Sequence, residues 1–427
     1  MQVLTLLCRP RRWLIVLGVG TLVLAGVSPF LWAGYHWYAG QAALQRSHNA
    51  DARRHFDACL TVWPWSRSGG MHLLAARAAR RDGDFPEAFA HLQKAQSILG
   101  DQAPETLLEW AMQHAAGGDL EKVESYLQEQ ARKDSEHAPL IWEALIRGYM
   151  SVNRILDALQ DVEEWLKHDP DNVQALYLRG SIYRQSGAWN RVAPDLRRVV
   201  EIDPEFPAAR WWLAVALVNV GYYEEAVRHL ERLRQHPPQD VDPVEILVQL
   251  AICRSRLGRS REARELLEAI LAQHPHHGLA LLTRGQIEQM NGQLEQAEKW
   301  LRQAVHALPY DYKAHWSLME CLRQRGKNEQ AEAVEGYANQ LMERWTRVSE
   351  LTTRQMSQRP NDPALYCELG KLMIELGNEE AGKNWLRSAL HLDPHCIPAL
   401  MALADYYKKQ GDTEKAEEYR RQAQQTH

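Results

Sequence analysis

Histidine and cysteine are the side chains of this sequence that most directly suggest metal or nucleophilic chemistry. The chain has 18 histidines, and three of them, His274, His276 and His277, are clustered in one loop-like stretch. Imidazole groups at close spacing can bind Zn²⁺. The other histidines are scattered, however, and many stand just before a proline, as His274 does. We therefore interpret the cluster as a solvated loop, and the sequence predicts neither a metal site nor a cofactor.

The sequence contains no other pattern of residues that indicates metal binding or catalysis. The six cysteines are far apart and never form a Cys-x-x-Cys pair, which disfavours a zinc knuckle or a thioredoxin-like site. A Gly-rich phosphate loop, a serine nucleophile elbow and a His-Glu-x-x-His pair are all missing from the sequence. The prediction is a protein that is not an enzyme.

Length and charge narrow the range of protein classes further. The 427 residues are enough for two or three ordinary domains, and 45% hydrophobic with 25% charged residues is a globular composition. The formal net charge of -5 gives no reason to expect a nucleic-acid partner, which usually requires a basic face.

Glycines and prolines recur with a period of 34 residues along most of the chain. Gly187 and Gly221 are 34 residues apart, as are Gly258 and Gly292. A small residue such as Ala226 stands five positions after the glycine. Gly at a turn accepts a left-handed backbone, and Pro ends the helix that follows. This spacing predicts repeated pairs of short antiparallel helices that approach closely at the small residue.

Read in series, these positions resemble the tetratricopeptide repeat family. In residues 173–206 the family's signature is represented by Leu176, Gly180, Tyr183, Gly187 and Pro204. Residues 139–172, 278–311 and 363–396 match in the same way, with Asn153 at the turn of the first. The resemblance implies an all-α, right-handed α-solenoid of about eleven helix pairs.

The N-terminus differs from the repeats. Residues 13–32 contain no charged side chain, and a helix of that length would span about 30 Å, the thickness of a bilayer core. Arginines precede the stretch and aromatic residues flank it. This predicts a cytoplasmic tail at 1–12, a transmembrane signal anchor at 13–33 and an exported repeat domain. The alternatives are a cleaved signal peptide, with Val23-Leu24-Ala25 as the cleavage site, and a buried helix.

The remaining chain is expected to hold about nine repeats in 34–338, an extra helix in 339–360 and a final repeat pair in 361–427. The apolar residues of 331–356 follow a seven-residue pattern over two and a half heptads. Two interpretations stay open for this helix: packing on its own solenoid, or self-association through an arm.

A solenoid of this type binds partners along the groove formed by its first helices. Extrapolated helical spacing predicts inward residues that are basic near the N-terminus and aromatic or apolar further along. These candidates are Arg77, Arg80, Arg81, Arg147, Tyr177, Arg184, Trp211, Val215, Ile252, Leu282 and Trp316. Trp and Tyr at such places are typical anchors for a peptide. The alternative is that the apolar members pack against neighbouring helices and that the arginines are simply solvated.

The leading hypothesis is thus a membrane-tethered scaffold or assembly factor that holds a protein segment in the groove. The alternative is a ligand- or glycan-handling accessory module of an export or envelope-biogenesis system, suggested by the tryptophans of the inner face.

Overall fold

The computed structural model describes residues 10–46, 48–62, 67–238, 241–359 and 362–424. Within these ranges the secondary structure is helical and contains no strand. The chain divides into two compact units, Met1–Gly148 and Tyr149–His427, and each is described by itself. The expected all-α solenoid of paired helices is confirmed for the described residues.

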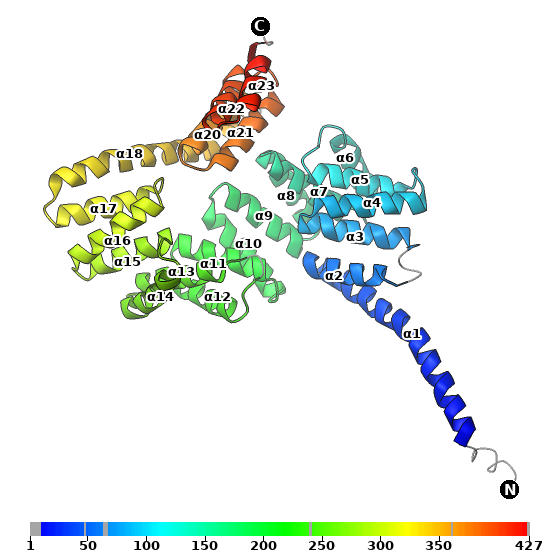
Figure 1. The fold of residues 1–427 in the computed structure, drawn as a ribbon. Helices are drawn as coiled ribbons and strands as arrows, with labels where there is room; N and C mark the ends of the chain where they lie inside the picture. The colour runs from blue at the N-terminus through cyan, green and yellow to red at the C-terminus, as the bar shows by residue number, and fades with distance from the viewer. Residues whose placement is uncertain (1–9, 47, 63–66, 239–240, 360–361, 425–427) are drawn as a thin grey trace. The chain divides into compact units, whose positions relative to one another are not determined.

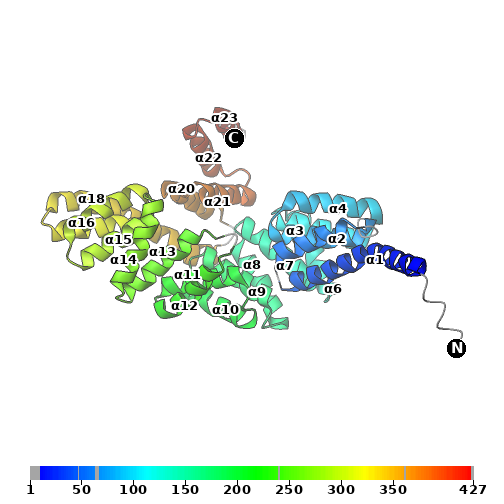
Figure 2. The same cartoon turned by 60° about the horizontal axis from the view of Figure 1, so that its bottom comes forward.

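Unit 1 consists of three helix pairs followed by most of α7 (Figure 1). Its helices are α1 (Pro10–Gln45), α2 (Asn49–Leu60), α3 (Gly69–Asp82), α4 (Phe85–Leu99), α5 (Pro104–Ala116), α6 (Glu124–Lys133) and α7 (Ala138–Ser151). Successive hairpins stack beside one another, as seen for α3, α4 and α5 in Figure 1 and for α2, α3 and α4 in Figure 2.

Unit 2 continues the alternation of first and second helices. Its helices are α8 (Ile155–His168), α9 (Val173–Gln185), α10 (Trp189–Ile202), α11 (Pro207–Val220), α12 (Tyr223–Gln235), α13 (Pro243–Arg256), α14 (Ser260–Gln273), α15 (Gly278–Met290), α16 (Leu294–Ala307), α17 (Tyr312–Gln324), α18 (Asn328–Glu350), the π-helical η3 (Leu351–Gln355), α19 (Met356–Gln358), α20 (Pro363–Glu375), α21 (Glu379–Leu392), α22 (Ile397–Lys409) and α23 (Thr413–Gln424). With α18 to α19 counted as one long second helix, the described chain holds eleven first and eleven second helices.

The turn glycines behave as the period predicts. Gly83 and Gly221 end α3 and α11 with φ of 87° and 89°, a left-handed conformation that lacks the Cβ penalty only for glycine. Asn153 takes the same place after α7 with φ of 58°, which asparagine tolerates better than most residues. The small residue of the second helix is fully buried, as Ala226 is in α12.

The closest helix approach in unit 2 lies between α20 and α21. A Cβ built on Gly370 would stand 2.7 Å from Leu386 Cγ and 2.9 Å from the carbonyl oxygen of Gly382. A Cβ on Gly382 would in turn stand 2.7 Å from the carbonyl oxygen of Gly370. The two glycines therefore let two backbones touch where no side chain fits.

The N-terminal uncharged stretch does not form a separate helix. It belongs to α1, which runs without a break through Pro29 and ends inside the first helix pair. There Ala33 is buried, its carbonyl oxygen accepts a hydrogen bond from Cys59 Sγ at 3.2 Å, and Gly40 lies against the ring of Phe56.

The expectation of a membrane anchor at 13–33 is corrected by the structure. Across the part of the chain that is described, no helix combines the length and the apolar character needed to cross a bilayer. The predicted single-pass membrane protein with an exported repeat domain is therefore wrong on this finding. Residues 1–9 of the expected tail at 1–12 lie outside the described residues.

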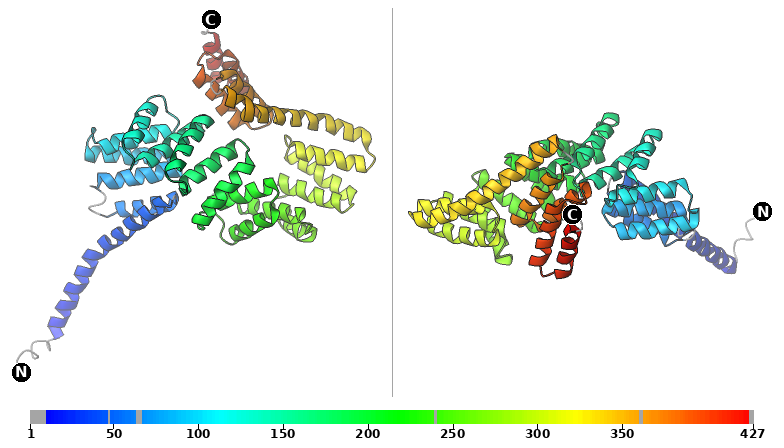
Figure 3. Two further views of the ribbon diagram at one scale, coloured as in Figure 1. Left: turned by 180° about the vertical axis from the view of Figure 1, so that it is seen from behind. Right: turned by 90° about the horizontal axis from the view of Figure 1, so that it is seen from above.

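The long α18 is the yellow helix of Figure 3. Its apolar stripe is buried inside its own unit. Ala331, Ala338, Leu341 and Val348 are all buried, and Leu341 and Val348 join the core formed with α20 and α21. The packing interpretation of this helix thus accounts for its seven-residue pattern, and self-association through 331–356 stays a prediction.

Unit 2 also contains one contact between residues more than 230 positions apart. Ser388 of α21 donates its hydroxyl to the carbonyl oxygen of Val152 at 3.0 Å and accepts from Asn153 Nδ2 at 3.4 Å. Gln185 Nε2 donates to Asn153 Oδ1 at 2.8 Å. Beside this seam is a cavity of about 180 Å³ whose lining includes Tyr366 and Trp385. The seam joins the late hairpin α20–α21 to the start of the unit.

Replacing Gly370 by Ala should destabilise unit 2, because the added methyl group collides with Leu386 and with the backbone of α21. Overpacking of this kind typically costs about 1–3 kcal/mol. The matched control is Gly336→Ala in α18, where a Cβ meets nothing within 4 Å. At this position the better helix propensity of Ala should stabilise unit 2 by about 0.5–1 kcal/mol. Urea unfolding of both variants measures the difference, and equal midpoints would contradict the close approach.

Candidate functional site

The four arginines predicted near the N-terminal end of the groove lie together on the first helices of unit 1. They converge on two carboxylates, Glu109 of α5 and Glu143 of α7. Arg77 Nε donates to Glu109 Oε1 at 2.7 Å, and Arg80 Nη2 lies 3.4 Å from Glu109 Oε2. On the other side, Arg81 forms an ion pair with Glu143, and Arg147 Nε donates to Glu143 Oε1 at 3.2 Å.

These six residues, which we call the arginine cluster, are graded in burial. The carboxylates Glu109 and Glu143 retain 3% and 1% of their side-chain exposure, and Arg80 retains 1%. Arg77 and Arg147 form the outer edge with 20% and 28%. A ligand in the groove would therefore meet the guanidinium groups of Arg77 and Arg147 first.

Electrostatics in the cluster follow from burial and pairing. Burial alone would raise the pKa of Glu109, but attraction to Arg77 and Arg80 outweighs it and the pKa is lowered. The pKa of Glu143 is lowered in the same way, burial being outweighed by Arg81, Arg147 and Arg80. Burial lowers the pKa of Arg80 despite both carboxylates.

The positive and negative charges of the arginine cluster do not cancel. Four guanidinium groups face two carboxylates, so the cluster carries two positive charges in excess. In addition, the buried atoms Arg80 Nη1 and Arg81 Nε have no hydrogen-bond partner in the described structure. A buried donor without a partner costs about 1–3 kcal/mol. The arrangement is suited to an anionic group.

The predicted aromatic and apolar residues lie on the first helices of unit 2, with differing exposure. The guanidinium of Arg184 stacks over the ring of Trp212 at 4.0 Å, and burial lowers the pKa of Arg184. The ring of Tyr177 lies 4.9 Å from that of Phe206. Trp211 and Leu282 are buried, so a ligand does not reach them without movement.

Tyr177 and Arg184 are half-buried, and three further predicted residues of this unit are also not buried. Val215 and Ile252 are half-buried, whereas Trp316 of α17 is 41% exposed. Met290, at the end of the preceding first helix α15, is 67% exposed and was not predicted. These side chains form the accessible apolar part of the inner helices.

Sequence reasoning also missed Glu109, Glu143 and Trp212. Glu143 had a usable signal, since it precedes Arg147 by four residues and such pairs share a helix face. Glu109 lies 32 residues after Arg77, and nothing in the sequence connects the two. Its role follows from the stacking of α5 on α3.

The histidine loop has a structural role. His277 caps α15 by accepting from the backbone N–H of Ala280 at 3.4 Å, and its Nε2 lies 3.2 Å from Glu245 Oε1. Among the described residues, His274 and His276 are not part of a group of three possible metal ligands.

Tetratricopeptide repeat models match residues 39–104, 363–396 and 397–425. A further model matches residues 108–285 and is described as the N-terminal domain of the T7SS ESX-1 secretion system protein EccA1. Together with the stacked helix pairs, these matches support the tetratricopeptide-repeat class for this chain, as expected from its glycine and proline period.

Curated relatives are distant and longer. DnaJ homolog subfamily C member 3 of Bos taurus is 22% identical over 245 residues, covering 57% of this chain and 41% of that protein. Protein CTR9 homolog of Arabidopsis thaliana is 24% identical over 307 residues, covering 70% and 26%. The chain thus spans less than half the length of these relatives.

Solved structures with similar folds include PilW, described as a type IV pilus biogenesis factor, and human IFIT1 in complex with an RNA. PilW is 19% identical with a TM-score of 0.39, covering 46% of this chain and 90% of that one. The IFIT1 dimer with m7Gppp-AAAA is 17% identical with a TM-score of 0.35, covering 84% and 90%.

Glu109→Gln should destabilise unit 1 at neutral pH, because it leaves Arg77 and Arg80 without their counter-charge. Removing one partner of a buried ion pair typically costs about 3–5 kcal/mol. The lowered pKa of Glu109 means that its stabilisation is complete above the carboxyl pKa of the unfolded chain, about 4.3, and is lost as the pH falls below it. As the pH is lowered, the free energy of unfolding of the variant should therefore fall less steeply than that of the wild type.

The measurement is urea unfolding followed at pH 7 and at several values below pH 4.5. Glu129→Gln provides the control, since Glu129 is an exposed residue of α6 whose partner is Lys133. Equal acid sensitivity of wild type and Glu109→Gln would contradict the assigned role of this carboxylate.

Proposed function

We propose that this chain is a non-enzymatic interaction scaffold whose first helices hold a segment of another protein, and that this segment is acidic where it meets unit 1. The observation that carries the proposal is the arginine cluster, in which four guanidinium groups share two carboxylates. Tetratricopeptide repeats generally serve as scaffolds for protein partners, which supports the class of function. The acidic character of the partner is our inference from the charge.

The positions of the arginines suit a carboxylate ligand. A guanidinium group offers paired donors that match a carboxylate, and such charge-assisted hydrogen bonds are about twice as strong as neutral ones. The partly exposed Arg77 and Arg147 lie at the edge, and the unpaired Arg80 Nη1 lies behind them. A buried environment strengthens the attraction, because the charges are poorly screened by water and salt.

The accessible apolar residues of unit 2 supply a second kind of contact. Trp316 and Met290 are the large inner side chains that keep substantial exposure, and Trp is a frequent energetic anchor at interfaces. We infer that the bound segment carries apolar residues for this part of the scaffold.

The alternative, an accessory module of an export or envelope-biogenesis system, has one supporting observation. Residues 108–285 match the model of a secretion-system protein's N-terminal domain. This match concerns the cellular setting and is compatible with protein binding. The glycan-handling version has less support, because Trp211 is buried and one face of Trp212 is covered by Arg184.

An array of acidic 12-residue peptides, each paired with a counterpart in which Gln and Asn replace Glu and Asp, tests the proposal. Fluorescence anisotropy with the full chain should show binding to acidic peptides that weakens with added salt. Arg77→Gln and Arg147→Gln should each weaken binding about tenfold, the value expected for one charge-assisted hydrogen bond.

The matched control is Arg54→Gln on α2, an exposed arginine paired with Asp51. It should leave the affinity unchanged. Equal binding of acidic and amide peptides, or full affinity in both groove variants, would refute the proposed site and leave the arginine cluster as a purely structural network.

A further inference from the structure

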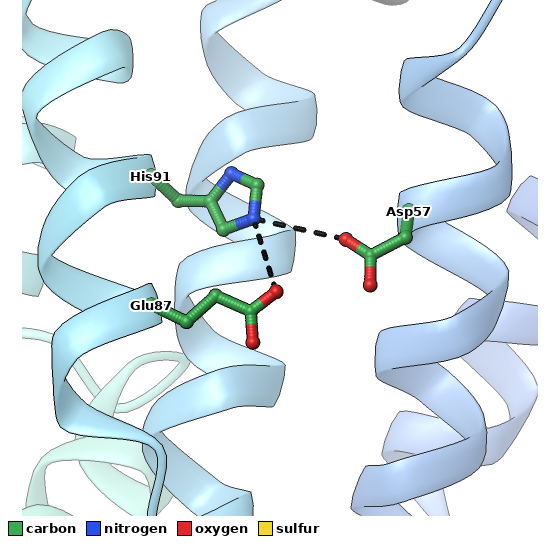
Figure 4. A group of neighbouring side chains, drawn as sticks. All are labelled: Asp57, Glu87 and His91. Atoms are coloured by element: carbon green, nitrogen blue, oxygen red, sulfur yellow. Dashed lines mark ion pairs between the residues drawn. The ribbon is translucent and has the colours of Figure 1, made fainter.

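Three possible metal ligands, none of which belongs to the arginine cluster, meet on the second helices of the first two repeats (Figure 4). Asp57 comes from α2, while Glu87 and His91 stand one turn apart on α4. His91 Nε2 lies 3.7 Å from Asp57 Oδ1 and 3.9 Å from Glu87 Oε1. All three ligand atoms lie within 4.8 Å of one another.

The imidazole of His91 is held in place from behind. Its Nδ1 lies 3.0 Å from Nδ1 of the buried His72 on α3, and this contact turns Nε2 toward the two carboxylates. When Nδ1 of His91 donates to His72, the lone pair of Nε2 is free for a metal ion. A second hydrogen-bonding group behind a ligating histidine is the usual way in which proteins fix the ligand's tautomer and orientation.

The local charge favours a cation. Asp57 and Glu87 face one another with Asp84 nearby, and both Asp57 and Asp84 raise the pKa of Glu87 after the larger effect of burial. Arg53 opposes them, since it forms ion pairs with Glu87 Oε2, Asp82 and Asp84. One guanidinium group is thus shared among three carboxylates, and it pairs with Glu87 through Oε2, whereas His91 lies near Oε1.

The chain contains its own comparison for this group. In α12, Glu225 and His229 stand at the repeat positions of Glu87 and His91, four and eight residues after the turn glycine. Arg197 of α10, the residue after the buried Leu196, stands where Asp57 follows the buried Phe56 in α2. There Arg197 binds Glu225 through two hydrogen bonds of 2.9 and 3.0 Å. Where the later repeat supplies a positive side chain, the earlier one supplies a second carboxylate.

We propose that Asp57, Glu87 and His91 bind a divalent transition-metal ion of the Zn²⁺ class, which joins the first helix pair to the second. One imidazole with two carboxylates suits Zn²⁺ and its neighbours in the first transition row, whereas Mg²⁺ and Ca²⁺ prefer oxygen ligands alone. Zn–N and Zn–O bonds of about 2.0–2.2 Å place tetrahedral ligand atoms about 3.4 Å apart. The observed distances of 3.7 Å from His91 to Asp57 and 3.9 Å from His91 to Glu87 require small inward movements of both carboxylates.

Isothermal titration of the metal-free full chain with Zn²⁺ alone tests the proposal, and Co²⁺ absorption reports the coordination geometry. We expect one bound ion per chain that raises the midpoint of thermal unfolding. Asp57→Arg, which copies the arrangement of Arg197, should fold and lose this ion, and His91→Gln should lose it as well.

His72→Leu separates positioning from ligation, since Leu176 and Leu281 occupy the same repeat position elsewhere in the chain. It should bind Zn²⁺ about 10- to 100-fold more weakly while keeping the stoichiometry. His137→Gln is the control, because His137 pairs with Asp134 alone at 2.7 Å. Unchanged Zn²⁺ stoichiometry in Asp57→Arg and His91→Gln, or equal loss in His137→Gln, would overturn the proposal.

Discussion

The close approach of two antiparallel helices at a small residue is the constraint on which this structure depends. Each helix pair is too small to bury its apolar face alone and must stack on its neighbours. Stacking works only where one backbone can come near another, as at Gly370 and Gly382 or at the fully buried Ala226. The 34-residue period places such a residue in almost every pair. The surface formed by the first helices is therefore a consequence of packing.

Charges inside this stack are handled in two ways. Within unit 1, the arginine cluster places Glu109 and Glu143 almost entirely out of water and surrounds them with more arginines than they can neutralise. On the second helices, Glu225 is paired with Arg197, whereas Glu87 shares Arg53 with two other carboxylates, Asp82 and Asp84. Burial raises the energetic importance of each imbalance, because weak screening strengthens both attraction and repulsion. The two proposed binding sites lie at places where this balance is broken in opposite directions: the arginine cluster has more positive groups than negative ones, and the group around Arg53 has more negative ones.

Packing also explains the segment whose length departs from the 34-residue period. The long α18 extends past the length of an ordinary second helix and buries its apolar stripe against α20 and α21. The hairpin that follows reaches the turn at Asn153, where Ser388 contacts the backbone of Val152. A regular repeat would not supply this contact. The irregular segment thus sets the course of the last hairpins within unit 2.

The sequence by itself determined the repeated helix pairs, their turns and the basic character of the first inner helices, because these depend on residues close together in the chain. Gly187, Gly221 and Asn153 could be assigned to turns from spacing alone. Sequence reasoning failed at residues 13–33, where an uncharged composition suggested a membrane helix, whereas among the described residues no helix has the length and apolar character that crossing a bilayer requires. Only the tertiary structure decided which inner residues are buried, as Trp211 is, and which are exposed, as Trp316 is. It alone brought Glu109 to Arg77 and Asp57 to His91, since the stacking of successive pairs, and no local pattern, sets which side chains face one another across helices.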